Sequence, residues 1–364
     1  MSNAFVPYSD SVEQVHPDEQ RTFDDIAATM HDIMHKIGDR QRHTTRAVHS
    51  KSHALVKAEL TINDNLPEPL RQGLAAQPGT YGVIMRISTN PGDILSDHIS
   101  SPRGLAIKIV GLDGEKLPNH TGETTQDFLL VNGPVFDTAD AAGFLKNMQM
   151  LDKNANAPEA LKQAVSTASR MGENVLEAVG LKSAFLKGFG EPANNPLGEV
   201  YFTQAPVRWG NYFGKVALVP VSENLVELYK KGLPHKGEWN ALRDEFSRFF
   251  KEESEAVWEL RVQLCTNLET MPVEDAHQEW SEKESPYLAV ATLKATAQEI
   301  YSDARRVFVD EKLSFNPWQC LVAHRPLGNI NRARFQAYQM SAKFRQEREG
   351  RERIEPKSIG ELPG

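Results

Sequence analysis

The feature that most constrains the fold of this chain is a series of short strand-like segments that recurs along most of its length. Each segment alternates apolar and polar residues or runs apolar, and several are joined by short polar turns containing Gly, Pro, Asn or Asp. The segments are residues 53–60, 81–88, 105–110, 127–131, 200–204, 215–220, 257–265 and 287–293. Eight antiparallel strands can close into a barrel, which removes exposed edges. We therefore predict an α+β fold, an eight-stranded antiparallel β-barrel with surrounding helices.

Helical patterns lie before, between and after the two groups of strands. Residues 18–37 place apolar side chains at intervals of three and four, as in an amphipathic helix. Residues 157–188, 240–251 and 329–348 also have helical character, and Pro356 and Gly360 then mark a loose tail. We expect three regions, which are an N-terminal helical arm (1–39), a barrel with its helices (40–350) and a C-terminal tail (351–364).

Two histidines of the first helix, His31 and His35, lie one helical turn apart. A pair at this spacing could bind a metal ion, but no carboxylate or third ligand accompanies it. We interpret both residues as part of a packed or half-exposed helix surface.

The composition is that of an ordinary soluble globular protein, with 40% hydrophobic and 25% charged residues in 364. A net charge of -8 argues against a general nucleic-acid binder, which needs a basic face. No run of about 20 apolar residues is present, and the N-terminus has no basic region followed by an apolar stretch. We expect a cytoplasmic protein without stable membrane insertion, whose partner is a small molecule.

The segment INRARFQAYQMSAKFR carries Arg334, Tyr338 and Arg345 at offsets of four and seven, so all three project from one face of a helix. A guanidinium one turn from a phenol stabilises the phenolate, and a buried tyrosinate can ligate ferric haem. The second arginine could pair with a haem propionate. The alternative is a basic surface helix with a half-buried tyrosine.

Two further groups of residues suggest chemistry. His49 stands just before a strand-like run, where it could act as a general base on a peroxide or simply be structural. Arg86 and Ser88 share one face of a strand, and Arg103 precedes the next. A buried arginine needs an anionic partner, so either a dianionic ligand such as haem or ordinary salt bridges would explain this pattern.

Taken in order, these pieces resemble motifs of the catalase superfamily. The motifs are R-x-V-H before a strand, R-[FI]-S-T, P-R-G-[FL]-A-x-K, and R-x-x-x-Y with an arginine seven residues after the tyrosine. The resemblance covers roughly residues 40–350. The stretch HRPLGNINRAR is similar to the small catalase-related haem proteins rather than to the large catalases.

The resemblance implies a b-type haem and assigns roles around it. Tyr338 would be the proximal iron ligand, held as tyrosinate by Arg334. His49 would be the distal acid–base residue, with Ser88 as its hydrogen-bond partner. Val48 would narrow the approach to the iron.

The resemblance also implies propionate-binding residues and a distal wall. Large catalases carry a distal asparagine shortly before a Phe-Phe strand, whereas here Thr124 stands at the nearest aligned position in GETTQDFLLVN. Phe128 or Phe136 would supply the apolar distal wall. The arginines matched to the haem propionates are Arg46, Arg86 and Arg345.

These roles imply a haem peroxidase that cleaves hydrogen peroxide or organic hydroperoxides with an organic reductant, and that has weak catalase activity. A fatty-acid hydroperoxide isomerase or lyase would use the same site without a reductant. A third interpretation, from another class, is a haem-binding protein without turnover. The resemblance and the frequency of homodimers allow a homodimer. No G-x-G-x-x-G follows a strand, so a Rossmann site is not supported.

Overall fold

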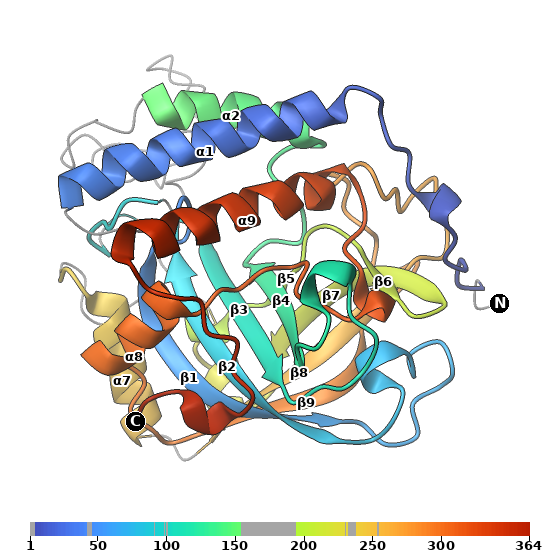
Figure 1. The fold of residues 1–364 in the computed structure, drawn as a ribbon. Helices are drawn as coiled ribbons and strands as arrows, with labels where there is room; N and C mark the ends of the chain where they lie inside the picture. The colour runs from blue at the N-terminus through green and yellow to red at the C-terminus, as the bar shows by residue number, and fades with distance from the viewer. Residues whose placement is uncertain are drawn as a thin grey trace, which may run out of the picture.

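A computed structural model of the chain shows a barrel with helices packed over one end and one side of it (Figure 1). It describes residues 4–41, 46–90, 92–97, 99, 101–153, 194–229, 231, 238–252 and 255–364. The helix predicted over residues 157–188 lies outside the described residues.

The described residues form one antiparallel sheet that closes on itself through eight strands. The order β1–β2–β3–β4–β5–β7–β8–β9 returns to β1, and β6 extends the sheet beside β7. Closure depends on β5, whose Phe202 pairs with Val131 of β4 and with Ala217 of β7. The bounds are β1 Lys51–Ile62, β2 Thr80–Thr89, β3 Arg103–Val110, β4 Thr125–Val131, β5 Tyr201–Phe202, β6 Val207–Trp209, β7 Tyr212–Pro220, β8 Glu255–Leu264 and β9 Leu288–Thr296. All eight predicted strands and the barrel are confirmed.

Side-chain alternation along the strands separates the barrel interior from its outer face. In β2, Val83, Met85 and Ile87 join the large interior core, whereas Arg86 and Ser88 alternate with them. The interior is filled by Val, Leu, Ile and two tryptophans, Trp209 and Trp258, that are essentially inaccessible to solvent. It is therefore a packed core, and any ligand site must lie on the outer face.

Six helices are described. They are α1 Glu19–Gln41, α2 Ala141–Lys153, α6 Glu223–Val226, α7 Ala241–Glu252, α8 Asp303–Arg306 and α9 Asn329–Glu349. The predicted helices over 18–37, 240–251 and 329–348 are thereby confirmed as α1, α7 and α9. None of the described helices has both the length and the apolar character that a membrane span requires.

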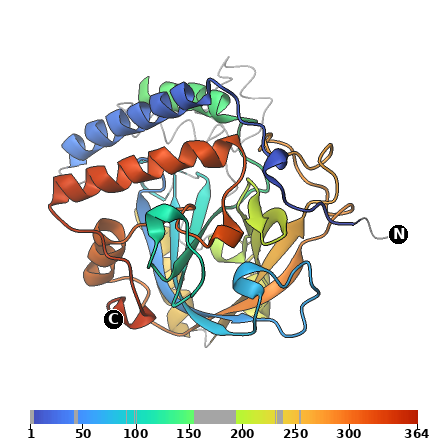
Figure 2. The same cartoon turned by 45° about the vertical axis from the view of Figure 1, so that its right-hand side comes forward.

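Helices α1, α2 and α9 cover one end of the barrel, and α1 lies beside α9 in two views of the molecule (Figure 1 and Figure 2). A separate hydrophobic cluster joins them, with Met34 of α1 and Ala337 of α9 among its members. His31 and His35 pack here as aromatic rings, 4.5 Å apart, and contact Phe344 at 5.1 and 4.6 Å. These histidines therefore contribute to the contact between α1 and α9.

The prediction of a loose C-terminal tail was wrong. Leu362 is buried in a cluster on the outside of β1 and β2, and the carboxylate of Glu355 contacts Lys108 Nζ at 2.6 Å. Pro356 and Gly360 limit helix formation, but apolar and charged side chains between and beside them fix the segment to the barrel. Helix α9 ends earlier, at Glu349, where Gly350 has a left-handed φ of 61°, and the chain beyond it is nevertheless fixed to the barrel.

The start of α9 is fastened to the N-terminal segment by one arginine. Arg332 contacts Glu13 Oε1 at 2.7 Å, Glu19 Oε1 at 2.8 Å and Glu274 Oε2 at 3.0 Å. The arginine and the two N-terminal carboxylates are largely buried, so water screens these contacts only partly. Arg332 thus sets where α9 begins relative to α1 and the barrel.

Replacing Arg332 by glutamine should release the segment before α1. Because three carboxylates lose their common cation, we expect the free energy of unfolding to fall by about 2–3 kcal/mol. Chemical denaturation measures this loss, and limited proteolysis should cut faster near residue 15. The matched control is Lys343→Gln, which removes an exposed pair with Glu347 on the same helix and should change stability by less than about 0.5 kcal/mol. Equal stability of the two variants would contradict the anchoring role.

Candidate functional site

A cavity of about 330 Å³ lies between α9 and the outer faces of β2, β3 and β4. A second cavity of about 150 Å³ adjoins it. The two share His49 and Val48 on the barrel side and Arg334 and Tyr338 on the α9 side. Residues from the two ends of the sequence therefore meet in one continuous space.

Helix α9 brings Arg334, Tyr338 and Arg345 to the first cavity, as their spacing predicted. Arg334 Nη2 donates to Tyr338 Oη at 3.3 Å, one turn further along the helix. Arg334 is itself held by Asn331, whose Oδ1 accepts from Nη1 at 3.1 Å. The Asn331 amide is buried and donates to Pro206 O at 2.9 Å. The Arg334 guanidinium is therefore held in a fixed position beside the phenol oxygen of Tyr338.

His49 is held in an uncommon backbone conformation at the rim of the barrel. Its φ of 53° lies in the left-handed region, and two side chains bind its peptide groups. Asn90 Oδ1 accepts from His49 N at 3.2 Å, and Arg86 Nη2 donates to His49 O at 2.8 Å. The ring packs so closely on β3 that a Cβ added to Gly104 would lie 2.6 Å from His49 Nδ1. Only glycine at position 104 leaves room for this ring position.

The environment of His49 keeps its imidazole neutral. Burial lowers the pKa of His49 to about 3, and the positive charges of Arg86 and Arg334 add to this effect. Nδ1 is buried without a hydrogen-bond partner among the described residues. A neutral imidazole at a cavity wall can accept a proton from a bound ligand at ordinary pH.

Three arginines gather at one end of the first cavity around a single carboxylate. Arg46 Nη1 and Arg86 Nε contact Asp310 Oδ1 at 2.8 and 3.1 Å, and Arg345 Nη1 donates to Asp310 O at 2.8 Å. Three guanidinium charges against one carboxylate leave an excess of two positive charges in this cluster. Since buried charge is costly unless it is compensated, the cluster suits a ligand with two anionic groups.

Most of the predicted site residues meet at these cavities. Phe136 lies at the second cavity, where its ring centroid is 5.4 Å from that of Phe144. Ser88 faces the first cavity, but its hydroxyl donates to Gly104 O at 3.4 Å and the expected bond to His49 is not formed. The other predicted residues that line one or both cavities are Arg46, Val48, His49, Arg86, Arg334, Tyr338 and Arg345.

Two predicted residues lie elsewhere. Thr124 directly precedes β4, whereas Val131, at the opposite end of that strand, lines both cavities. Phe128 points into the barrel interior, where its ring lies 6.0 Å from that of His324, because it alternates with the cavity-lining Leu129 and Val131. Of the two residues predicted for the apolar distal wall, Phe136 lines the second cavity and Phe128 lines neither.

The structure identifies three residues near the site that the sequence interpretation missed. Asn132 follows Val131 at the cavity end of β4, and its Oδ1 accepts from Arg103 N at 2.9 Å. It precedes Phe136 by four positions, a signal that would have favoured it over Thr124. Asn90 lines the second cavity. Asp310 lies in a π-helical segment, Val307–Lys312, which has no clear sequence signature.

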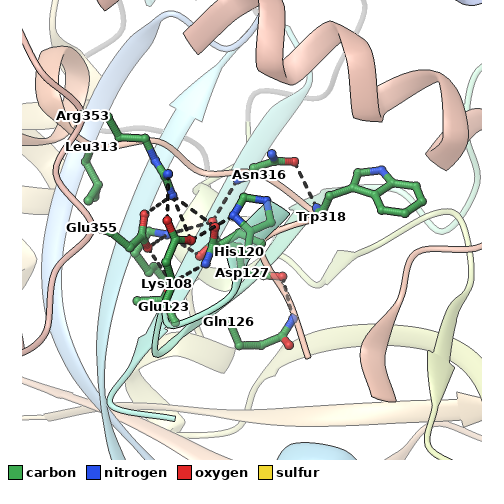
Figure 3. A network of polar contacts seen from close by, with 12 residues as sticks. Lys108, His120, Glu123, Gln126, Asp127, Leu313, Asn316, Trp318, Arg353 and Glu355 are labelled. Carbon is green, nitrogen blue, oxygen red and sulfur yellow. Dashed lines mark hydrogen bonds and ion pairs between the residues drawn. The ribbon is translucent and has the colours of Figure 1, made fainter. Parts of the chain in front are cut away.

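The first cavity also reaches a polar network on the outer face of β3 and β4 (Figure 3). His120 lines the cavity, and its Nδ1 lies 2.9 Å from Glu123 Oε2. Burial raises the pKa of Glu123, but hydrogen bonds from His120 and Arg353 outweigh this and hold it at about 2. Lys108, essentially inaccessible to solvent, contacts both Asp127 and Glu355. The network joins the C-terminal tail to the barrel beside this cavity.

Comparison with known proteins supports the fold. No family model matches the sequence, and no curated protein matches it. A fungal catalase gives a TM-score of 0.58 at 16% identity, covering 84% of this chain and 60% of its own. A bacterial catalase gives 0.57 at 16% identity, with 87% and 60% covered, and catalase A from Saccharomyces cerevisiae gives 0.58 at 14%, with 95% and 68% covered. The chain has the catalase fold and spans 60% of the length of the first two.

The low pKa of His49 predicts how its ring titrates. In the unfolded chain a histidine takes up a proton near pH 6.5, whereas in the folded chain His49 stays neutral down to about pH 3. His49 therefore contributes stability above pH 6.5 that is lost as the pH falls toward 3. Ring ¹⁵N NMR of the ligand-free protein should show a neutral His49 at pH 5. A His49 midpoint near 6.5 would contradict this assignment.

Proposed function

We propose that this chain binds a b-type haem in the first cavity and is a haem peroxidase of the catalase superfamily. The observation that carries the proposal is the convergence of an arginine-paired tyrosine and a neutral histidine on one cavity, beside an excess of two positive charges. The catalase fold supports the same assignment. At its coarsest, the protein is an oxidoreductase that acts on peroxides.

The residues of the cavity fit such a cofactor. Tyr338 would ligate the iron, and the guanidinium of Arg334 would keep its oxygen anionic. The two haem propionates would match the charge excess of Arg46, Arg86 and Arg345 around Asp310. Bound haem would supply the iron at which a peroxide O–O bond is cleaved.

His49 would move the proton that this cleavage requires. Its neutral imidazole would accept a proton from one peroxide oxygen and return it to the oxygen that leaves. Arg86 fixes the His49 peptide through its carbonyl, and Asn90 fixes it through its amide. Asn132, at the cavity end of β4, is a better candidate for the distal amide than Thr124, which the resemblance put at the nearest aligned position.

The second cavity bears on the choice of peroxide. Besides His49 and Asn90, its wall includes apolar side chains from α1, α2 and the segment before α2, among them Ile26, Phe136 and Phe144. An apolar space beside the proton-transferring histidine suits the carbon chain of an organic hydroperoxide better than water or hydrogen peroxide. An organic reductant would complete the peroxidase cycle.

The same cavity would also suit a fatty-acid hydroperoxide isomerase or lyase, which rearranges its substrate without a reductant. A haem-binding protein without turnover is the remaining alternative, and it assigns no chemical role to the neutral His49. The peroxidase is favoured because a proton-accepting histidine serves heterolytic cleavage of the O–O bond, whereas homolytic cleavage has no need of one.

Replacing Tyr338 by phenylalanine should abolish normal iron ligation. Wild-type protein reconstituted with hemin should show a high-spin ferric Soret band, and Tyr338→Phe should lose that band or show it strongly altered. Optical spectroscopy at equal haem and protein concentrations measures this, with Tyr229→Phe as a control at an exposed tyrosine that lines neither cavity. A wild-type protein that takes up no haem would refute the proposed function.

Lipid hydroperoxide should separate the two enzymatic alternatives. With a peroxidase, the wild type should convert the hydroperoxide to its alcohol only when a reductant is present, and His49→Ala should slow this at least about a hundredfold. Mass spectrometry identifies the products. Rearranged products formed without reductant would favour the isomerase or lyase, and unchanged turnover in His49→Ala would count against acid–base catalysis.

A further inference from the structure

We infer that Asp310 is a positioning residue for the whole cavity. Its carboxylate holds two of the propionate-side arginines in place and, through Arg86, fixes the peptide of His49. The inference deepens the proposed function and rests on it for the part that concerns haem. Asp310 does not itself line either cavity.

The Asp310 carboxylate is fully engaged. One oxygen accepts from Arg46 Nη1 at 2.8 Å and from Arg86 Nε at 3.1 Å. Ser52 Oγ lies 2.7 and 2.9 Å from the two oxygens. Burial raises the pKa of Asp310, but Arg86, Arg46 and the Ser52 hydroxyl outweigh this and hold it below its usual value. The carboxylate therefore favours its anionic form and binds two cations at once.

The segment that carries Asp310 contributes backbone acceptors to the same arginines. Arg345 Nη1 donates to Asp310 O at 2.8 Å, and Arg46 Nη2 donates to Val309 O at 2.8 Å. Asp310 and Val309 belong to the π-helical segment Val307–Lys312. A π-helix is an uncommon local structure that often marks functional positions. Here it turns one carboxylate and two carbonyl groups toward three guanidinium groups.

Arg86 connects this cluster to the proton-transferring side of the cavity. The guanidinium that binds Asp310 through Nε donates through Nη2 to His49 O at 2.8 Å and to Ser50 O at 3.2 Å. His49 has a φ of 53°, a conformation that a non-glycine residue keeps only when its surroundings hold it there. Asp310, Arg86 and the His49 carbonyl thus form one continuous chain of contacts.

Two roles for Asp310 predict opposite effects of removing its charge. If Asp310 were only a counter-ion, Asp310→Asn would leave more positive charge for the propionates and haem would bind more tightly. If Asp310 positions the arginines, the same variant would disorder them and haem would bind more weakly. The geometry favours the second outcome, because the Asp310 carboxylate binds Arg46, Arg86 and Ser52 at once.

The test compares Asp310→Asn with Glu311→Gln. Glu311 is the next residue of the same segment and pairs with Arg306 and Arg351 instead. Haem loss from each reconstituted protein is followed by transfer to an acceptor apoprotein. We expect haem loss to be roughly tenfold to a hundredfold faster in Asp310→Asn, and unchanged in Glu311→Gln. Equal or slower haem loss in Asp310→Asn would overturn the inference.

A second readout does not require haem. In ligand-free protein, the backbone amide and ring ¹⁵N resonances of His49 should shift in Asp310→Asn and stay in place in Glu311→Gln. Unmoved His49 resonances would overturn the link through Arg86, even if haem is bound normally. If the resonances shift in Asp310→Asn but the wild-type protein binds no haem, the proposed function is refuted and the positional link is kept.

Ser52→Ala provides a milder change should Asp310→Asn fail to fold. It removes only the hydroxyl that donates to the Asp310 carboxylate. We expect the same His49 resonances to shift in the same direction by a smaller amount, and haem loss to be about twofold to fivefold faster. No change in either readout would count against Asp310 as the anchor.

Discussion

The alternation of side chains along β2, β3 and β4 is the constraint on which both the core and the site depend. Each strand gives one set of apolar residues to the closed barrel, and that packed interior leaves no space for a ligand. The other set therefore faces outward, under α9, where Arg86 and Ser88 become part of a cavity wall. A register shift of one residue in any of these strands would exchange the two sets and would therefore disrupt the core and the cavity at the same time.

Much of the fold could be predicted because these patterns are local. Alternation reveals the strands, and offsets of four and seven place Arg334, Tyr338 and Arg345 on one helical face. Thr124 and Phe128 were predicted at the site but lie away from it. Their placement depends on where β4 ends and on which face of the strand each residue occupies, and local patterns do not give either. An error of one residue in the assigned position along a strand is enough to exchange a residue of the cavity wall for one that faces the barrel interior. The tail was misjudged because its partners on the barrel lie far away in the sequence.

The cavity is assembled from groups whose charges make sense only together. Arg46, Arg86 and Arg345 come from three separate parts of the chain, and each alone would have been an ordinary salt-bridge candidate. Asp310 binds all three arginines, but its single negative charge compensates only part of their positive charge. Burial keeps His49 neutral and the charge of Arg86 adds to this effect, so one arginine that suits an anionic ligand also helps to prepare a base. The spacing of these residues along the chain does not predict this coupling.

The fastening of α9 by Arg332 has a consequence for the order in which the molecule is built. The glutamates that hold this helix lie at positions 13, 19 and 274, so Arg332 joins α9 to a segment before the barrel strands and to the loop between β8 and β9. Contacts of such long sequence separation form late, after the local hairpins of the barrel. The barrel strands can therefore pair before α9 covers the cavity. The helix that carries Tyr338 is seated only when the segment before the barrel strands meets it, so a complete site requires that the barrel and both of these flanking segments have folded.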